Sequence, residues 1–121
     1  MIINRKKQKR FKRKRRIRKY ISGTPERPRL TVYKSARNIY AQVIDDTLGQ
    51  TIISASTLDK ELRGSILGIK KIEAAQKVGE LLVQRCIKKN IQKVVFDCNG
   101  YTYHGRIAKL AQTARDKGLS F

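Results

Sequence analysis

The segment from residue 5 to residue 19 constrains the fold most, because 12 of its 15 side chains are Lys or Arg. A run of this kind has too little apolar surface to join a core, and its charges repel one another. We therefore expect it to be disordered on its own. Its residue types favour a helix, so neutralisation by phosphate groups would allow it to become helical.

The positive charge is concentrated at the N-terminus. Residues 1–29 hold 14 basic side chains and one acidic side chain, whereas residues 30–121 hold 15 and 8. The first quarter thus carries +13 of the net charge of +20. This asymmetry is typical of a protein that binds a polyanion through a basic arm. The candidate phosphate contacts in the arm are Arg5, Lys6, Lys7, Lys9, Arg10, Lys12, Arg13, Lys14, Arg15, Arg16, Arg18 and Lys19.

Proline marks the boundary between the arm and the rest of the chain. The only two prolines, Pro25 and Pro28, lie in a stretch that also holds Ser22 and Gly23. We therefore divide the chain into a basic RNA-binding arm (1–22), a linker (23–29) and an α/β RNA-binding domain (30–121). The 92 residues of this last part suffice for a small core.

The hydropathy pattern after the linker predicts three strands at 30–33, 39–44 and 51–56, joined by turns short enough for an antiparallel meander. Residues 57–68 are either a short helix or a loop. A helix at 69–89 has Ile72, Ala75, Val78, Leu82 and Cys86 on one face and Asn90 as its C-terminal cap. A buried strand at 94–96 and a last helix ending at Gly118 follow. The predicted fold class is α/β, in the order β-β-β-α-β-α. It has a three-stranded antiparallel meander plus one parallel strand, helices on one sheet face and a basic N-terminal arm.

The second face of the predicted sheet is polar and aromatic, and no remaining segment is available to cover it. Its side chains are Thr31, Tyr33, Tyr40, Gln42 and Ser54. The tyrosines can stack on unpaired bases while Lys34 and Arg37 hold phosphates. The alternative is ordinary cross-strand aromatic packing.

A loop at 97–106 is the third candidate site. It carries Tyr101, Tyr103, His104 and Arg106 just before a helix N-terminus, which attracts phosphate. The alternative is an ordinary capped connection. Asp97 can pair with Arg106, hold the loop backbone or act as a catalytic carboxylate.

An enzyme is not expected from this sequence. His104 is the only histidine, no Cys, His and Asp set has the spacing of a metal site, and no phosphate-binding glycine motif is present. Cys86 and Cys98 are interpreted as reduced thiols. No cofactor, no membrane segment and no homo-oligomer are expected. Two rival functions remain: a general DNA or RNA compaction protein, and a metal-dependent nuclease that uses Asp97.

Three stretches of the sequence resemble the bacterial-type family of large-subunit ribosomal protein eighteen, which binds 5S rRNA. They are residues 27–44, residues 55–57 and residues 96–121, the last with Phe96-Asp97, Gly100, Tyr103-His104-Gly105-Arg106, Leu110-Ala111, Ala114-Arg115 and Gly118-Leu119. The resemblance covers essentially the whole chain. It departs from the family at Cys98, where an Arg is usual, so we assign Cys98 no binding role.

The resemblance implies a structural constituent of the large ribosomal subunit that attaches 5S rRNA to the large-subunit rRNA in the central protuberance, beside neighbouring ribosomal proteins. It implies RNA contacts at the arm and at Ser35, Arg37, Asn38, Tyr40, Gln42, Tyr103, His104, Gly105 and Arg106. Our candidate set adds Arg29, Tyr33, Lys34 and Tyr101. The linker and Asp45-Asp46-Thr47 look more like plastid and cyanobacterial members. We therefore expect a ribosome in a plastid stroma or a bacterial cytoplasm, with a preference for the plastid.

Overall fold

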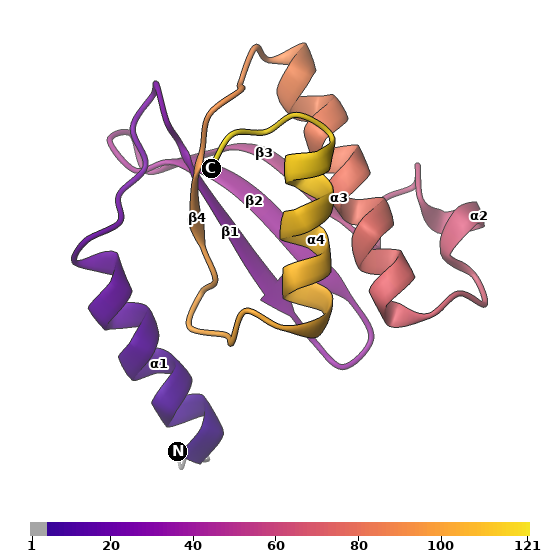
Figure 1. Ribbon diagram of the computed structural model, residues 1–121, viewed down its shortest axis with the longest axis horizontal. Helices are drawn as coiled ribbons and strands as arrows, with labels where there is room; N and C mark the ends of the chain where they lie inside the picture. Colours follow the sequence, from indigo (N-terminus) through magenta and orange to yellow (C-terminus); the bar gives the residue numbers. More distant parts are fainter. Residues whose placement is uncertain (1–4) are drawn as a thin grey trace.

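One four-stranded sheet, with helices on one face, organises the structure (Figure 1), a computed structural model that describes residues 5–121. The first four residues of the predicted arm lie outside the described part. The strand order is β3-β2-β1-β4, in which β4 pairs parallel with β1 and the other neighbours are antiparallel. This confirms the predicted fold class. The elements are α1 (Arg5–Arg18), β1 (Arg29–Lys34), β2 (Ile39–Asp45), β3 (Gln50–Ser56), α2 (Arg63–Ile66), α3 (Lys71–Lys88), β4 (Val95–Asp97) and α4 (Gly105–Asp116).

The core lies between the sheet and the helices α3 and α4. Alternate side chains of β1 and β2, such as Leu30, Val32 and Val43, are fully buried because successive strand residues point to opposite faces. α3 and α4 cover them, and the two helices pack closely at Gly79, where an added Cβ would lie 3.0 Å from a backbone oxygen of α4. The predicted inner face of α3 is confirmed except for Ile72. This residue is exposed because it lies in the first turn of the helix, which is solvent-exposed.

Helices α3 and α4 are each followed by a residue in the left-handed conformation. Asn90 has φ 58°, and the N–H groups of Asn90 and Ile91 donate to the last turn of α3. Gly118 has φ 118° and closes α4 in the same way. This is the hydrogen-bond pattern of a Schellman motif, which satisfies carbonyl groups that would otherwise lack partners. The two predicted helix ends are therefore confirmed.

Two segments differ from the sequence prediction, and a third, which the sequence left open, is settled by the structure. The basic arm is not disordered but forms α1, because one side of this helix contacts the loop after β4. The last strand is a short, half-buried edge strand rather than one covered on both faces. Its far side meets the C-terminal residues, where Lys93 pairs with Ser120 and Phe96 stacks on Phe121. Of the ambiguous residues 57–68, only α2 is helical.

The opposite edge of the sheet is β3, and the side chain of Arg85 from α3 covers part of it. Its Nη1 atom donates to the Ser54 carbonyl oxygen at 2.6 Å. Asp59 and Glu61 hold the same guanidinium at 2.9 and 3.4 Å. These contacts also tie the segment after β3 to α3.

The segment between α1 and β1 is packed against the sheet rather than free. The Gly23 N–H donates to Asp46 at 2.6 Å, and the Asp46 N–H donates back to the Gly23 carbonyl oxygen at 3.1 Å. The carbonyl oxygen of Pro28 accepts the Val95 N–H at 2.9 Å. Within residues 5–121, no helix is both long enough and apolar enough to cross a membrane.

The close approach at Gly23 leads to a stability prediction. A Cβ at this position would lie 2.5 Å from the Arg29 nitrogen and from the Ile44 oxygen, both backbone atoms that cannot move aside easily. We expect Gly23→Ala to lower the free energy of unfolding by about 1–3 kcal/mol, measured by urea denaturation. The matched control is Gly64→Ala, where an added Cβ meets nothing within 4 Å. Equal midpoints for the two variants would contradict this packing.

Candidate nucleic-acid interface

The arm helix lies against the loop after β4 through one of its faces. Arg10, Arg13, Lys14 and Ile17 recur every three or four residues and are half-buried. Burial and repulsion by Arg18 hold the pKa of the Lys14 ammonium below its ordinary value. This face is the side of α1 that does not face solvent.

Two backbone carbonyl groups of the loop receive the arm. Arg10 donates to the Asn99 carbonyl oxygen at 3.0 Å, and Arg13 donates to the Gly100 carbonyl oxygen at 2.9 Å. Gly100 has φ 79°, and an added Cβ would collide with the backbone of Arg10. Glycine is therefore required at this position for two reasons: the backbone has a positive φ, and the helix lies too close to leave room for a side chain.

Asp97 lies at the centre of the polar contacts below the arm and is fully buried. Its Oδ2 atom accepts from Arg29 at 2.9 Å and from Arg18 at 3.4 Å. Its Oδ1 atom accepts the Asn99 N–H at 2.9 Å, so Asp97 holds the loop backbone as one of the alternatives predicted. The predicted pairing with Arg106 is wrong.

Arg29 also pairs with the turn between β2 and β3. Its Nε and Nη2 atoms donate to the two carboxylate oxygens of Asp46 at 2.9 and 3.0 Å. These hydrogen bonds hold the pKa of the Asp46 carboxyl below its ordinary value. Arg29, a predicted RNA contact, is buried and bonded to two carboxylates, so we leave it out of the proposed contact set.

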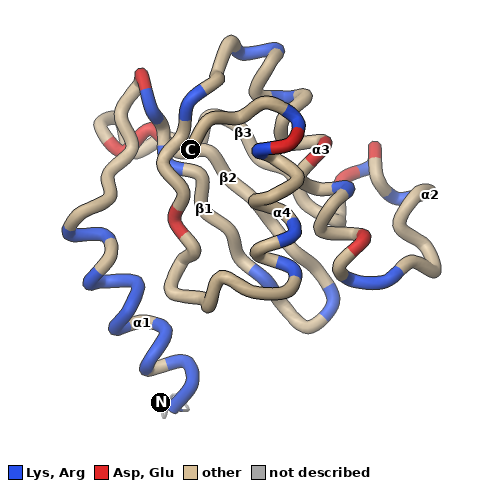
Figure 2. The backbone as a smooth tube through the Cα atoms, viewed as in Figure 1, with Lys and Arg blue, Asp and Glu red and all other residues tan. Residues whose placement is uncertain are grey.

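The opposite face of α1 is exposed and basic. Figure 2 shows that α1 holds the densest run of Lys and Arg in the described chain. The backbone of α1 spaces these side chains along about 20 Å of helix. The predicted contacts that lie on exposed positions of the arm are Arg5, Lys6, Lys7, Lys9, Lys12, Arg15, Arg16, Arg18 and Lys19, of which Arg18 also contacts Asp97.

Tyrosine side chains form a row on the sheet face beside the arm. Tyr33 and Tyr40 are direct cross-strand partners with ring centroids 5.7 Å apart. Tyr101 from the loop follows at 6.5 Å from Tyr33, and the guanidinium of Arg10 lies 4.6 Å above the Tyr101 ring. The Lys34 ammonium lies 5.4 Å from the same ring. A continuous aromatic and cationic strip thus joins the sheet to α1.

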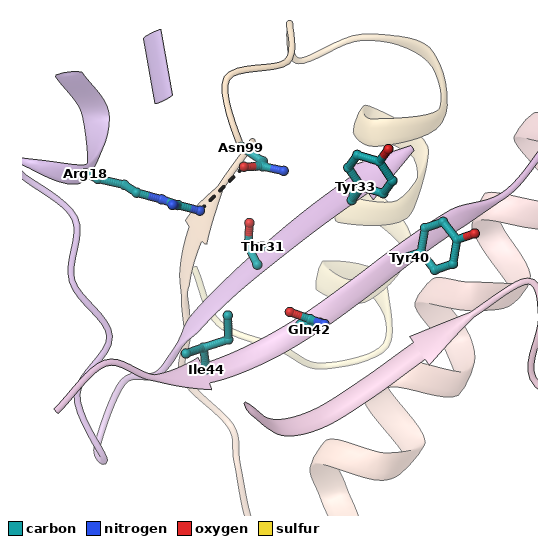
Figure 3. Close-up of a pocket in the computed structure, with 7 residues that line it drawn as sticks. All are labelled: Arg18, Thr31, Tyr33, Tyr40, Gln42, Ile44 and Asn99. Carbon is teal, nitrogen blue, oxygen red and sulfur yellow. Dashed lines mark hydrogen bonds between the residues drawn. The ribbon is translucent and has the colours of Figure 1, made fainter. Parts of the chain in front are cut away.

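Two clefts open along this strip. One, of about 410 Å³, lies over the sheet (Figure 3). The other, of about 620 Å³, lies between α1 and the loop. The sheet face is therefore narrower than predicted, because α1 and the loop border it and Thr31 is buried. The first cleft is lined by Arg18, Thr31, Tyr33, Tyr40, Gln42, Ile44 and Asn99. The second is lined by Lys6, Lys7, Arg10, Arg13, Tyr33, Lys34, Tyr101, Thr102, His104 and Gly105.

The remaining predicted contacts surround the turn between β1 and β2. Arg106 donates to the Ser35 carbonyl oxygen at 3.0 Å, which ties the start of α4 to this turn. Asn38 accepts from the Thr57 hydroxyl at 2.8 Å and donates its N–H to Ser35. The side chain of Arg37 is exposed at the tip. The structure thus brings Ser35, Asn38 and Arg106 together.

Two further side chains of the loop face solvent. His104 is exposed at the N-terminal boundary of α4. Tyr103 is about half exposed and meets the edge of Phe96 at 6.2 Å. Cys98 is half-buried, and burial raises the pKa of its thiol. Among residues 5–121, no three His, Cys, Asp or Glu side chains gather as a metal site would require.

Comparison with known proteins identifies the fold family. A sequence model described as "Ribosomal L18 of archaea, bacteria, mitoch. and chloroplast" matches residues 4–121. The chain belongs to this family. The resemblance found in the sequence is thereby confirmed.

Three bacterial relatives match this chain over nearly their whole length. The large ribosomal subunit protein uL18 of Sorangium cellulosum is 58% identical over 112 residues, or 93% of this chain and 94% of that protein. The uL18 protein of Dictyoglomus turgidum is 56% identical over 122 residues and all of both chains, and that of Thermotoga petrophila is 55% identical over 116 residues, or 96% and 95%.

Family membership settles the general class. The chain is a structural protein of the ribosome and not an enzyme. The nuclease alternative is therefore wrong, in agreement with the complete burial of Asp97 between two arginines. The relatives compared here are bacterial, and they give the expected plastid location no support.

Sequence reasoning missed the residues that hold the arm. The sequence analysis gave Asn99, Gly100 and Asp46 no role in holding the arm or the linker. The Asn-Gly pair was the available signal, since both residues tolerate the left-handed conformation that they adopt here. Nothing in the spacing of Asp46 or Asp97 indicates that they share Arg29.

The docking of α1 predicts a difference between two pairs of substitutions on the same helix. We expect the double variant Arg10→Ala, Arg13→Ala to exchange its α1 amide hydrogens about tenfold faster in the full chain, because each substitution removes a charged donor to a loop carbonyl group. This corresponds to a loss of about 1.4 kcal/mol in the free energy of opening the helix. Arg15→Ala with Arg16→Ala removes the same charge from exposed positions and is expected to leave exchange nearly unchanged. Equal exchange rates of the α1 amides in the two double variants would contradict the docking of α1 on the loop.

The Asp46–Arg29 pair predicts an acid-sensitive contribution to stability. The pKa of Asp46 is lower in the folded than in the unfolded chain, so this contribution is complete above the unfolded value of about 3.9 and is lost as pH falls through the folded value. We expect Asp46→Asn to cost about 1–3 kcal/mol at pH 7 and to flatten the loss of stability between about pH 5 and pH 2.

The measurement is urea denaturation across this pH range. Glu26→Gln is the control, because it removes one carboxylate from an exposed part of the linker. If Asp46→Asn kept the acid dependence of the unchanged chain, the pair would not be the cause.

Proposed function

We propose that the chain binds 5S rRNA and helps to attach it to the large-subunit rRNA in the central protuberance of the large ribosomal subunit. One observation carries the proposal: the basic arm and the tyrosine-bearing sheet face line the same clefts. Lys6 and Lys7 of α1 face Tyr33, Lys34 and Tyr101 across the larger cleft. A surface of this composition suits RNA with unpaired bases beside a phosphate backbone.

The arm supplies the contacts that do not depend on sequence. Its exposed Lys and Arg side chains attract phosphate groups and release counterions when they bind. Because α1 is already helical and held at the loop, little of its backbone has to be ordered on binding. The arm therefore acts as a positioned cationic rod, and the predicted division at residues 22 and 29 separates binding roles rather than folding units.

The folded part supplies selectivity. Irregular RNA exposes base faces and edges that tyrosine rings and amide groups can contact, whereas duplex DNA hides its base faces. Tyr33, Tyr40 and Gln42 lie on the open side of the sheet, and the turn with Ser35, Arg37 and Asn38 continues the polar surface. Arg106 contributes by holding that turn through the Ser35 carbonyl group.

A general compaction protein is the remaining alternative. Such a protein would need the arm but no fixed relation between the arm and a tyrosine-lined cleft. The docking of α1 on residues 99 and 100 favours the more selective function.

The function is tested by titrating the full chain with 5S rRNA, transfer RNA and duplex DNA of similar length, each at increasing salt. A chain of charge +20 binds all three at low salt. We expect only 5S rRNA binding to persist near about 0.15 M salt. If all three curves fell together, compaction would be the better description.

The arm's contribution is tested by removing three exposed charges from it. We expect Lys9→Gln, Lys12→Gln and Arg16→Gln together to reduce the slope of log affinity against log salt by about two to three, because each lost phosphate contact contributes about 0.7 to 0.9. The matched control replaces three exposed lysines near the end of α3, Lys88, Lys89 and Lys93, with glutamine. An equal reduction in both variants would show that net charge alone matters.

A further inference from the structure

The cleft over the sheet (Figure 3) presents a tyrosine pair beside the side-chain amide of Asn99. We propose that this cleft receives one unpaired nucleobase, which stacks on Tyr33 and Tyr40 and accepts a hydrogen bond from the Asn99 side chain. The inference rests on the RNA binding proposed above and names the residue that contacts the base.

The dimensions and walls of the cleft suit a small planar group. Its volume of about 410 Å³ lies in the lower part of the range of ligand-binding clefts, about 300–1,000 Å³. Tyr33, Tyr40 and Ile44 form a largely apolar floor on β1 and β2, and Arg18 and Asn99 rise at one side (Figure 3). An apolar floor with a few polar groups at the rim is typical of sites that bind a flat heterocycle.

The Asn99 backbone is held in one position. Its φ of 57° is a left-handed conformation that asparagine tolerates better than most residues. Its N–H donates to Asp97 at 2.9 Å, and its carbonyl oxygen accepts from Arg10 at 3.0 Å. Asn99 is therefore fixed to both the sheet and the arm.

The direction of the Asn99 side chain follows from its neighbour. Arg18 lies 3.5 Å from Oδ1, and because a guanidinium can only donate, the oxygen must face Arg18. The Nδ2 group then points over the cleft, toward Tyr33 (Figure 3). The cleft thus holds a preset hydrogen-bond donor.

Gln42 adds a second amide on the floor of the cleft. Its side chain is exposed and forms no hydrogen bond to the described residues 5–121. An amide offers one donor side and one acceptor side, which is the pairing that base edges require. Gln42 and Asn99 can therefore contact a base at two points of its edge.

A nucleobase fits this cleft better than a phosphate group. The only cation in the lining is Arg18, which already contacts Asp97 and Asn99. The bases of RNA are attached to a negatively charged backbone, so a cleft that binds a base is expected to lie beside the most basic helix of the chain. Ordinary cross-strand packing explains the contact between the two tyrosines, and the contact with Arg18 explains the direction of the Asn99 amide, which leaves its Nδ2 group turned toward the cleft.

The first test compares two probes that differ only in their bases. One is a single-stranded hexaadenylate RNA, and the other is an abasic ribose-phosphate chain of the same length. One homopolymer suffices because every base has a face that stacks. With the full chain at about 0.15 M salt, we expect the hexaadenylate to bind about tenfold tighter and to shift the side-chain amide signals of Gln42 and Asn99 in NMR spectra. Equal affinities without these shifts would overturn the proposal.

The second test uses two identical substitutions. Asn99→Asp replaces the donor with an acceptor and keeps a side chain of the same shape. Asn90→Asp makes the same change at a residue with nearly the same φ of 58°, at the end of α3 and away from the cleft. We expect Asn99→Asp to reduce the preference for hexaadenylate over the abasic chain about tenfold and Asn90→Asp to leave it unchanged.

A third variant keeps the test independent of folding. Gln42→Ala changes an exposed side chain on the cleft floor and is expected to lower the same preference severalfold. Retention of the full preference in both Asn99→Asp and Gln42→Ala would overturn the proposal. The 5S rRNA titration separately tests the proposed function, so failure there with an intact base preference would leave the cleft assignment standing.

Discussion

The buried carboxylate of Asp97 holds together the parts of the molecule that the sequence keeps apart. It lies opposite Thr31 where β4 pairs with β1, and it binds the guanidinium of Arg29. Arg29 in turn holds Asp46 in the turn after β2, and Asp97 also reaches Arg18 at the end of the arm. Removing a charge from water is costly, and this carboxylate offsets the cost with several hydrogen bonds. The sheet edge, the loop, the linker and the arm therefore share one anchor.

The same anchor reconciles a very basic helix with a folded domain. The three arginines in the last turn of this helix suit the helix dipole, but it has no acidic residue in its first turn and carries like charges three and four residues apart along its length, so it is poorly stabilised by itself. It is held here because its inner arginines donate to loop carbonyl groups and because Asp97 supplies a negative charge at its end. The outer side chains remain available for phosphate groups, so the charge that destabilises the isolated protein is the charge that attracts RNA.

Much of the fold follows from local patterns in the sequence, whereas most of the polar geometry does not. Alternation in β1 and β2, the inner face of α3 after its first turn and the endings at Asn90 and Gly118 were all predicted correctly, because each depends on neighbours in the chain. Residues 5–19 were expected to be disordered on their own because of charge repulsion and low apolar content; the loop that holds this helix lies more than 80 residues away and leaves no local signal. The tyrosines of the clefts were predicted, but the role of Asn99 depends on three contacts that only the folded chain brings together.

The covered edges of the sheet have a consequence for how the protein behaves at high concentration. An open strand edge is a template on which another chain can add a strand, and such additions lead to aggregates. Here the side chain of Arg85 occupies a carbonyl group of β3, and the C-terminal residues lie beside the chain leading into β4. A charged side chain at one edge and the protein's own tail at the other discourage pairing between copies. Both edges are therefore poor templates for strand addition by a second copy.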